Sequence, residues 1–165
     1  MADLIVDHWD QTHPRWDELE RIAAAVGQSE WFAVRFPWHR SSHVLVALQN
    51  GILCGFLRFT IQVIGEEDDC EPIFLDGELL IEGKVLAFAV IEEFRRRGIG
   101  RALQVHALEY AARLHCYQMR SHSGGEHAEN HQLKLWMGFG VFPIIRGSDH
   151  KGVYFVMPLR RTPQK

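Results

Sequence analysis

The feature that most constrains the fold is a nearly continuous apolar run, LLIEGKVLAFAVI (residues 79–91), followed closely by three arginines and Gly-Ile-Gly. An apolar run of this length is typical of a strand buried on both faces. After the glycines, apolar residues recur at intervals of one, three and four from Ile99 to Leu114, which predicts an amphipathic helix of about four turns. The chain therefore contains a buried strand, a glycine turn and a long helix in direct succession.

The flanking segments predict a mixed α/β fold. Apolar spacing predicts a helix over 16–26, and Ser29 is a suitable cap for a second, short helix. Asn50-Gly51, between two β-rich runs at 44–48 and 52–64, predicts a hairpin. We expect one continuous domain over residues 1–165. The remaining elements expected are a strand at 4–6, a strand at 117–121, a helix at 126–137 and closing strands at 139–145 and 153–159.

Composition narrows the class of protein. The formal net charge of −3 argues against a nucleic-acid binder, and no apolar run reaches membrane-spanning length. The N-terminus lacks a signal-peptide pattern, and three cysteines without metal-site spacing predict buried, unpaired thiols in a reducing compartment. We therefore expect a cytoplasmic protein that binds neither nucleic acid nor membrane. Five acids within residues 66–71 predict a solvated loop, with a metal or cationic-substrate role as the alternative.

The turn before the long helix has the chemistry of a phosphate cradle. The first N–H groups of a helix have no intrahelical partner, and the helix dipole adds partial positive charge. Glycine lets the backbone approach a phosphate closely, and arginine side chains can close over it. The glycine spacing matches neither the P-loop nor the dinucleotide fingerprint.

The stretch AVIEEFRRRGIGRAL resembles motif A of the GNAT superfamily of acyl-CoA-dependent N-acyltransferases, with Arg95, Gly98 and Gly100 at its matching positions. Glu92 stands where the family often has proline. LWMGFGVFP, which contains Gly138-Phe139, resembles motif B, and GVYFVMPL resembles the closing strand. The resemblance covers roughly residues 40–160. It implies a single GNAT-like domain with a twisted, mostly antiparallel sheet of six or seven strands and about four helices.

The resemblance implies an N-acetyltransferase that moves an acetyl group from acetyl-CoA to a primary amine of a small molecule or peptide, by direct attack in a ternary complex. In the family, the strand before motif A is splayed from its neighbour and runs beside the pantetheine, which here involves Phe88, Ala89 and Val90. The side chains of Arg95 and Arg101 are expected to add positive charge at the phosphates. The cofactor pyrophosphate is expected on the turn formed by Arg96, Arg97, Gly98, Ile99, Gly100 and Arg101.

Three further roles follow from counting back from Gly138-Phe139. The count puts His122 where some relatives carry a glutamate base, and an imidazole suits that role. Glu82, on the motif A strand, is the alternative base. His127 falls where a cofactor-contacting asparagine is common, and Asn130 is the alternative for that role if the helix is offset. Lys134 falls where a general-acid tyrosine often stands, so either its pKa is depressed, another group serves, or the thiolate leaves unaided.

Two alternatives to the enzyme remain at this point. One is a non-catalytic acyl-CoA sensor of the same fold. The other is a metal-binding protein that uses His122, His127 and His131, of which the last two have the i, i+4 spacing of metal ligands.

The sequence says less about the acceptor substrate and the oligomeric state. Many relatives dimerise, so a homodimer is one option. In the family, the first two helices and the loop after the third strand shape the acceptor site. In this chain these segments contain the acidic loop and Trp31, Phe32, Phe36, Trp38 and His39. We expect the aromatic residues to belong to the core and the acids to be solvated, and the alternative is an aromatic pocket rimmed by acids for a cationic amine.

Overall fold

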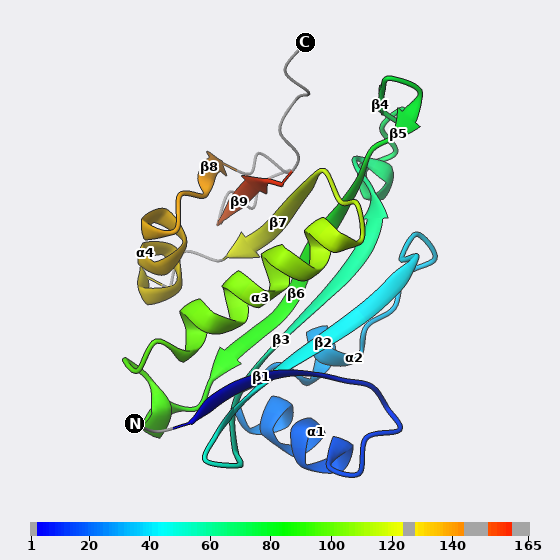
Figure 1. Ribbon diagram of the computed structural model, residues 1–165. Helices are drawn as coiled ribbons and strands as arrows, with labels where there is room; N and C mark the ends of the chain where they lie inside the picture. The colour runs from blue at the N-terminus through cyan, green and yellow to red at the C-terminus, as the bar shows by residue number, and fades with distance from the viewer. Residues whose placement is uncertain (1–2, 124–127, 144–151, 160–165) are drawn as a thin grey trace.

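The chain is organised around a seven-stranded sheet (Figure 1). The computed structural model describes residues 3–123, 128–143 and 152–159. The strand order is β1-β2-β3-β6-β7-β9-β8, and each neighbouring pair is antiparallel except β6 and β7, which run parallel. This confirms the predicted mixed α/β fold with a mostly antiparallel sheet and four α-helices. The strands are β1 Leu4–Trp9, β2 Ser41–Gln49, β3 Ile52–Val63, β4 Phe74–Leu75, β5 Glu78–Leu79, β6 Ile81–Val90, β7 Gln118–Ser123, β8 Gly140–Pro143 and β9 Val153–Pro158, and the helices are α1 Trp16–Ala25, α2 Ser29–Ala33, α3 Ile99–Arg113 and α4 Ala128–Trp136.

The β2–β3 hairpin turns at the predicted dipeptide. Asn50 and Gly51 have φ angles of 52° and 78°, so both central residues are left-handed. This is the conformation that a two-residue hairpin turn of matching twist requires. β3 continues as the long central strand of the sheet and pairs with β6 on its other side.

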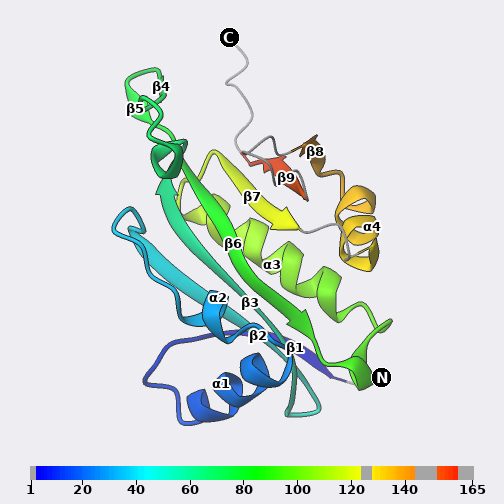
Figure 2. The same ribbon diagram turned by 180° about the vertical axis from the view of Figure 1, so that it is seen from behind.

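The two faces of the sheet carry separate apolar clusters. α3 covers one face, where Leu57, Phe59 and Leu103 belong to the same buried cluster. α1 and α2 cover the opposite face, where Leu19 and Phe56 belong to the other. α3 lies in front of the sheet in Figure 1, and α2 comes to the front in Figure 2. Alternate residues of each central strand therefore contribute to opposite layers.

Two details of the sequence predictions need correction. Cys54 and Cys116 are buried, but Cys70 is exposed, because it lies in the loop between β3 and β4 rather than in the core. Four acids of that loop are exposed as expected, whereas Glu67 turns inward and its side chain is only 7% exposed. Periodicity carries no information about a loop residue that folds back over a sheet, so these contacts were not predictable.

The described part of the chain contains no helix that is both long and apolar enough to cross a membrane.

Candidate active site

The turn between β6 and α3 presents a row of free backbone amides. Arg96 and Gly98 have φ angles of 63° and 79°, and the first hydrogen bond of α3 joins the Ala102 N–H to the Gly98 carbonyl. None of the six N–H groups from Arg96 to Arg101 has a backbone partner among the described residues. These amides lie at the positive end of a 15-residue helix. The predicted cradle residues are thus together and able to bind an anion.

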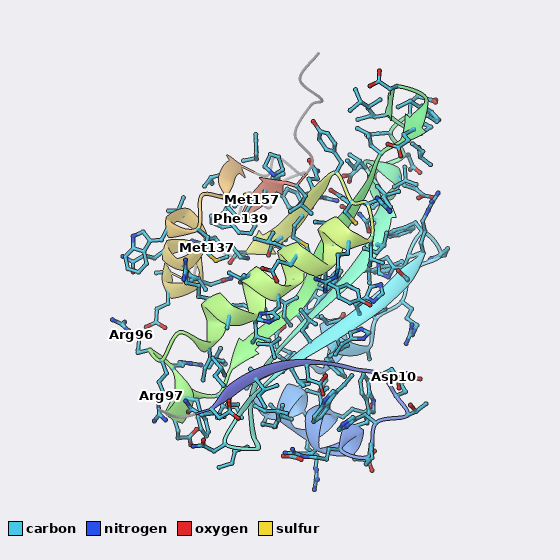
Figure 3. All side chains as sticks on the ribbon, viewed as in Figure 1. Asp10, Arg96, Arg97, Met137, Phe139 and Met157 are labelled. Atoms are coloured by element: carbon cyan, nitrogen blue, oxygen red, sulfur yellow. The ribbon has the colours of Figure 1, made fainter. Side chains whose placement is uncertain are left out.

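The arginine side chains around this turn divide into tethered and open ones. Arg95 Nε donates to the Val90 carbonyl at 3.1 Å, and Arg97 donates to the Glu93 carbonyl and the Gln49 side chain. Arg96 and Arg101 are exposed and make no hydrogen bond or ion pair with other described residues. Arg96 and Arg97 project outward beside the start of α3 (Figure 3). Positive charge therefore surrounds the cradle without neutralisation by described carboxylates.

Gly100 of the cradle packs against β6, the strand that precedes it. A Cβ atom at this position would lie 3.3 Å from the Phe88 ring, 3.4 Å from Leu133 Cδ2 and 3.7 Å from Val90 Cγ2. Phe88, Val90 and Gly100, all predicted cofactor contacts, thus lie together. Leu133 of α4 was not predicted, because only the tertiary fold places α4 beside the N-terminal end of α3.

β6 and β7 form a fork. Their parallel pairing runs from Glu82–Gln118 to Val85–Ser121, and beyond Val85 and Ser121 the two strands are no longer paired. β6 continues to Val90 with β3 as its partner on the other side. The edge of β6 from Leu86 to Val90 therefore has no paired strand on this side among the described residues, as the family resemblance implied. Its backbone groups can pair with an extended ligand.

His122 lies on the face of the sheet that α1 and α2 cover. Its side chain points to the opposite face from those of its neighbours Ser121 and Ser123 on β7. Its cross-strand partner on β9 is Tyr154, and the centroids of the two rings are 5.6 Å apart. The His122 side chain is exposed and passes close to Gly152. It lies one residue beyond the last β6–β7 pair, so it stands at the fork. His127 lies outside the described residues.

Glu82 lies deeper in the paired part of the strands. Its carboxylate is fully buried and accepts hydrogen bonds from Gln62 at 3.1 Å and Gln118 at 2.8 Å. Arg120 donates to it through Nε at 3.0 Å and through its terminal nitrogen at 2.7 Å. A carboxylate with these bonds and no exposed surface is a poor acceptor for a substrate proton. The geometry therefore favours His122 over Glu82 as the base.

The Glu82–Arg120 pair extends to the acidic loop. Glu67 accepts hydrogen bonds from both Lys84 and Arg120. Burial raises the pKa of Glu67, but its bonds to these two cations outweigh that effect, and the net pKa lies below its ordinary value. The network fixes the loop over the α1/α2 face of β6 and β7. Glu67 is thus a structural anchor, whereas its sequence neighbours remain in solvent.

The histidine cluster does not assemble among the described residues. His131 Nε2 lies 2.8 Å from the Ser123 hydroxyl, on the face of β7 opposite to His122. The described ranges contain no group of three or more His, Cys, Asp or Glu side chains that could hold a metal ion. His127, the third residue of the expected histidine cluster, lies outside those ranges.

A cavity of about 400 Å³ lies under α1 and α2, between the end of β1 and the start of β2. Its lining includes Trp9, Trp16, Phe32 and Arg58 but no residue of β6 or β7. Since the fork belongs to those two strands, this cavity is not part of it.

The fold, the amide cradle and the fork together define an acyl-CoA-dependent transferase. The chain belongs to the Acetyltransferase (GNAT) family, whose model matches residues 4–139. It is therefore an acetyltransferase.

Solved structures at low sequence identity share the fold of this chain. NAA60 from Arabidopsis thaliana in complex with acetyl-CoA has a TM-score of 0.70 and 17% identity, covering 94% of this chain and 99% of that one. The ribosomal-protein-S18-alanine N-acetyltransferase from Escherichia coli has a TM-score of 0.63 and 17% identity, covering 98% and 97%. Naa50 from Arabidopsis thaliana has a TM-score of 0.61 and 13% identity, covering 93% and 97%. No curated protein matches the chain.

Proposed function

We propose that this protein transfers the acetyl group of acetyl-CoA to a primary amine of a small molecule or peptide, by direct attack in a ternary complex. The observation that carries the proposal is the continuity of the cradle with the fork. Gly100 of the cradle is within contact range of Phe88 and Val90, which lie on the open edge of β6. A ligand that binds phosphate at α3 and continues along β6 brings its far end to the fork.

In this proposal the protein supplies position and proton transfer. The amides from Arg96 to Arg101 bind the pyrophosphate, and the β6 backbone pairs with the pantetheine amides. His122 accepts a proton from the attacking amine, directly or through one water, because an imidazole is partly unprotonated at neutral pH. The amine then attacks the thioester carbonyl from the α1/α2 face, where His122 lies.

The structural relatives support an amine acceptor. One acts on an alanine of a ribosomal protein by its name, and Naa50 was solved with the bisubstrate analogue CoA-Ac-MVNAL. That compound joins coenzyme A, an acetyl group and a peptide, which fits simultaneous binding of both substrates.

Exposed aromatic side chains lie in the segments that are expected to shape the acceptor site. Phe32 is a core residue, as favoured from the sequence, but Trp31 and Phe36 are 47% and 37% exposed. Phe36 stacks on Trp38 with ring centroids 4.7 Å apart. Burial, together with nearby Arg58 and Lys84, lowers the pKa of His39 beside them. These exposed aromatic rings favour an acceptor with an apolar portion next to its amine.

A cytoplasmic location and a homodimer remain part of the proposal. The three cysteines are free, including exposed Cys70, which suits a reducing compartment. Fractionation of cells that produce the full chain and sedimentation of the purified protein test these two points.

Acetyl-CoA binding can be tested by charge reversal at the two ends of α3. Arg101→Glu places a negative charge at the cradle, and Arg113→Glu is the matched control at the far end of the same helix. Acetyl-CoA at 100 times its Kd adds about 2.7 kcal/mol, which raises the Tm by roughly 5 to 10 °C. We expect this rise in the wild type and the control, and an approximately 30-fold weaker Kd for Arg101→Glu.

Turnover is then measured as thiol release with a panel of amines and peptides. His122→Ala should reduce kcat by about 100-fold or more at neutral pH, with acetyl-CoA binding retained. Binding without thiol release from any acceptor would refute the proposed transfer and favour an acyl-CoA sensor. Full activity of His122→Ala would refute the assignment of the base.

A further inference from the structure

α4 contributes a buried lysine that has no counter-charge among the described residues. Lys134 is 1% exposed, and each ion pair in the described part of the chain joins other side chains. Its Nζ donates a hydrogen bond to the Ser121 hydroxyl and lies 5.3 Å from the centroid of the Phe155 ring. Burial lowers the pKa of Lys134 to about 8. Burying an unpaired ammonium is unfavourable, so the position calls for a functional explanation.

The lysine lies at the vertex of the fork. Ser121, its hydrogen-bond partner, is the last β7 residue that pairs with β6. The preceding residue, Leu133, lies against the Gly100 position at the start of α3. α4 thus forms a wall between the cradle and the vertex, and the lysine is its charged group at the vertex end. The two views of the fold both place α4 beside α3 and β7 (Figures 1 and 2).

Lys134 and His122 approach the fork from opposite faces of the sheet. Successive residues of a strand point to opposite sides, so Ser121 faces α3 and α4 whereas His122 faces α1 and α2. A thioester between the parted strands would have the imidazole on one side and the ammonium on the other. This is the arrangement needed to remove a proton from the nucleophile and supply one to the leaving group.

Few of the described residues around Lys134 are ionisable. On α4 the nearest is His131, one turn earlier, which bonds to Ser123. β9 contributes the Phe155 ring, and β7 contributes the Ser121 hydroxyl. Burial is the single cause of the lowered pKa. Titration of Lys134 is therefore set by its apolar setting and not by a described carboxylate or second cation.

We propose that the Lys134 ammonium protonates the sulfur of coenzyme A as the acetyl group leaves. This inference rests on the proposed acetyl transfer. The amine nitrogen forms a bond to the thioester carbon and loses one proton to His122. When the C–S bond breaks, its electron pair stays on sulfur, which takes a proton from Lys134 and departs as the thiol. Lys134 is left as a neutral amine and regains a proton from solvent, while His122 releases one, so protons balance.

The acidity of the lysine suits this step. A thiol has an ordinary pKa of about 8.5, whereas an ordinary lysine has one of about 10.4 and would transfer its proton uphill. With a pKa of about 8, Lys134 matches the thiol closely. General acids are most effective when the two values are close to each other and to the working pH.

The decisive variant is Lys134→Met. Methionine keeps a similar length and the aliphatic stem of the side chain, but it removes the ammonium group and its proton. Leu135→Met, an exposed neighbour on the same helix, is the control. We expect kcat for thiol release to fall about 100-fold in Lys134→Met, with the Kd for acetyl-CoA changed less than threefold. We also expect the wild-type kcat to decline above about pH 8, and this alkaline limb to disappear in the variant. A structural role alone would change the Kd and leave the limb in place.

The outcomes separate this inference from the function on which it rests. Wild-type turnover with Lys134→Met kcat within threefold, or with an unchanged alkaline limb, would overturn the role of the lysine and leave acetyl transfer intact. If the wild type binds acetyl-CoA but turns over no amine, the proposed function fails. The lysine is then judged by ¹⁵N NMR titration of labelled lysine, assigned with Lys134→Met. A value near 8 supports a proton-donating group, and an ordinary value near 10.4 overturns it.

Discussion

Replacing Lys134 with methionine should make the protein more stable while it makes the enzyme slower. The fall of the lysine pKa from 10.5 to about 8 corresponds to about 3 kcal/mol against the charged folded state, at 1.36 kcal/mol per pKa unit. Methionine removes this penalty but leaves the buried Ser121 hydroxyl without its bond to lysine, which costs about 1 kcal/mol. The net gain at pH 7 is about 2 kcal/mol, or roughly 4 to 8 °C in Tm.

The stability gain should depend on pH in a defined direction. Between pH 8 and 10.5 the unfolded chain keeps the lysine proton and the folded chain does not. The unfolded state therefore binds more protons, and the free energy of unfolding of the wild type rises with pH through this window. At pH 10 the penalty is under about 1 kcal/mol, so the advantage of methionine should vanish.

Urea unfolding of the wild type, Lys134→Met and Leu135→Met at pH 7 and pH 10 tests this reasoning. The comparison between variants cancels the titration of all other groups. A methionine variant that is no more stable than the wild type at pH 7 would refute the argument that Lys134 is buried as a charge without a counter-charge among the described residues. So would an advantage of equal size at both pH values.

Three other perturbations follow from the described contacts. Glu82→Ala leaves Arg120 buried beside one carboxylate instead of two and should lower the free energy of unfolding by about 3 to 5 kcal/mol in urea titrations; a loss below 1 kcal/mol would contradict the buried network. Arg58→Ala removes three hydrogen bonds that hold α2, its C-cap and β2, so hydrogen exchange should increase in α2 before it increases in β6. Cys70 should react with a thiol reagent in the folded protein while Cys116 is protected, because burial raises the pKa of the Cys116 thiol to about 12; mass spectrometry of the labelled peptides shows which reacts first.

The sequence predicted those parts of the fold that local patterns determine. The hairpin at Asn50-Gly51 and the helix from Ile99 follow from turn chemistry and apolar spacing, and both are present. The cradle followed for the same reason, since its strand, glycines and helix are consecutive. The order of the strands and the fork required the family resemblance, because no local pattern states which strands pair.

The charged groups were harder to predict because their partners are distant in sequence. Glu82 was a candidate base as the carboxylate on its strand face, yet its main partner is Arg120, 38 residues away on the parallel strand. The register that brings them together, with Glu82 opposite Gln118 and Lys84 opposite Arg120, is a tertiary property. Sequence alone likewise gave no reason for Glu67 to close over these cations.

The interpretation of Lys134 needs both the sequence pattern and the tertiary structure. Counting from Gly138-Phe139 placed it where a general-acid tyrosine often stands in the family, but an ordinary lysine there would be a weak proton donor. Only the packing of α4 against β7 and β9 gives it the buried setting that lowers its pKa. The same packing should make the folded state less stable than it would be with an apolar residue at this position. A residue whose removal strengthens the fold and weakens the reaction is retained for chemistry, and the paired measurements of stability and kcat on one variant distinguish that explanation from a purely structural role.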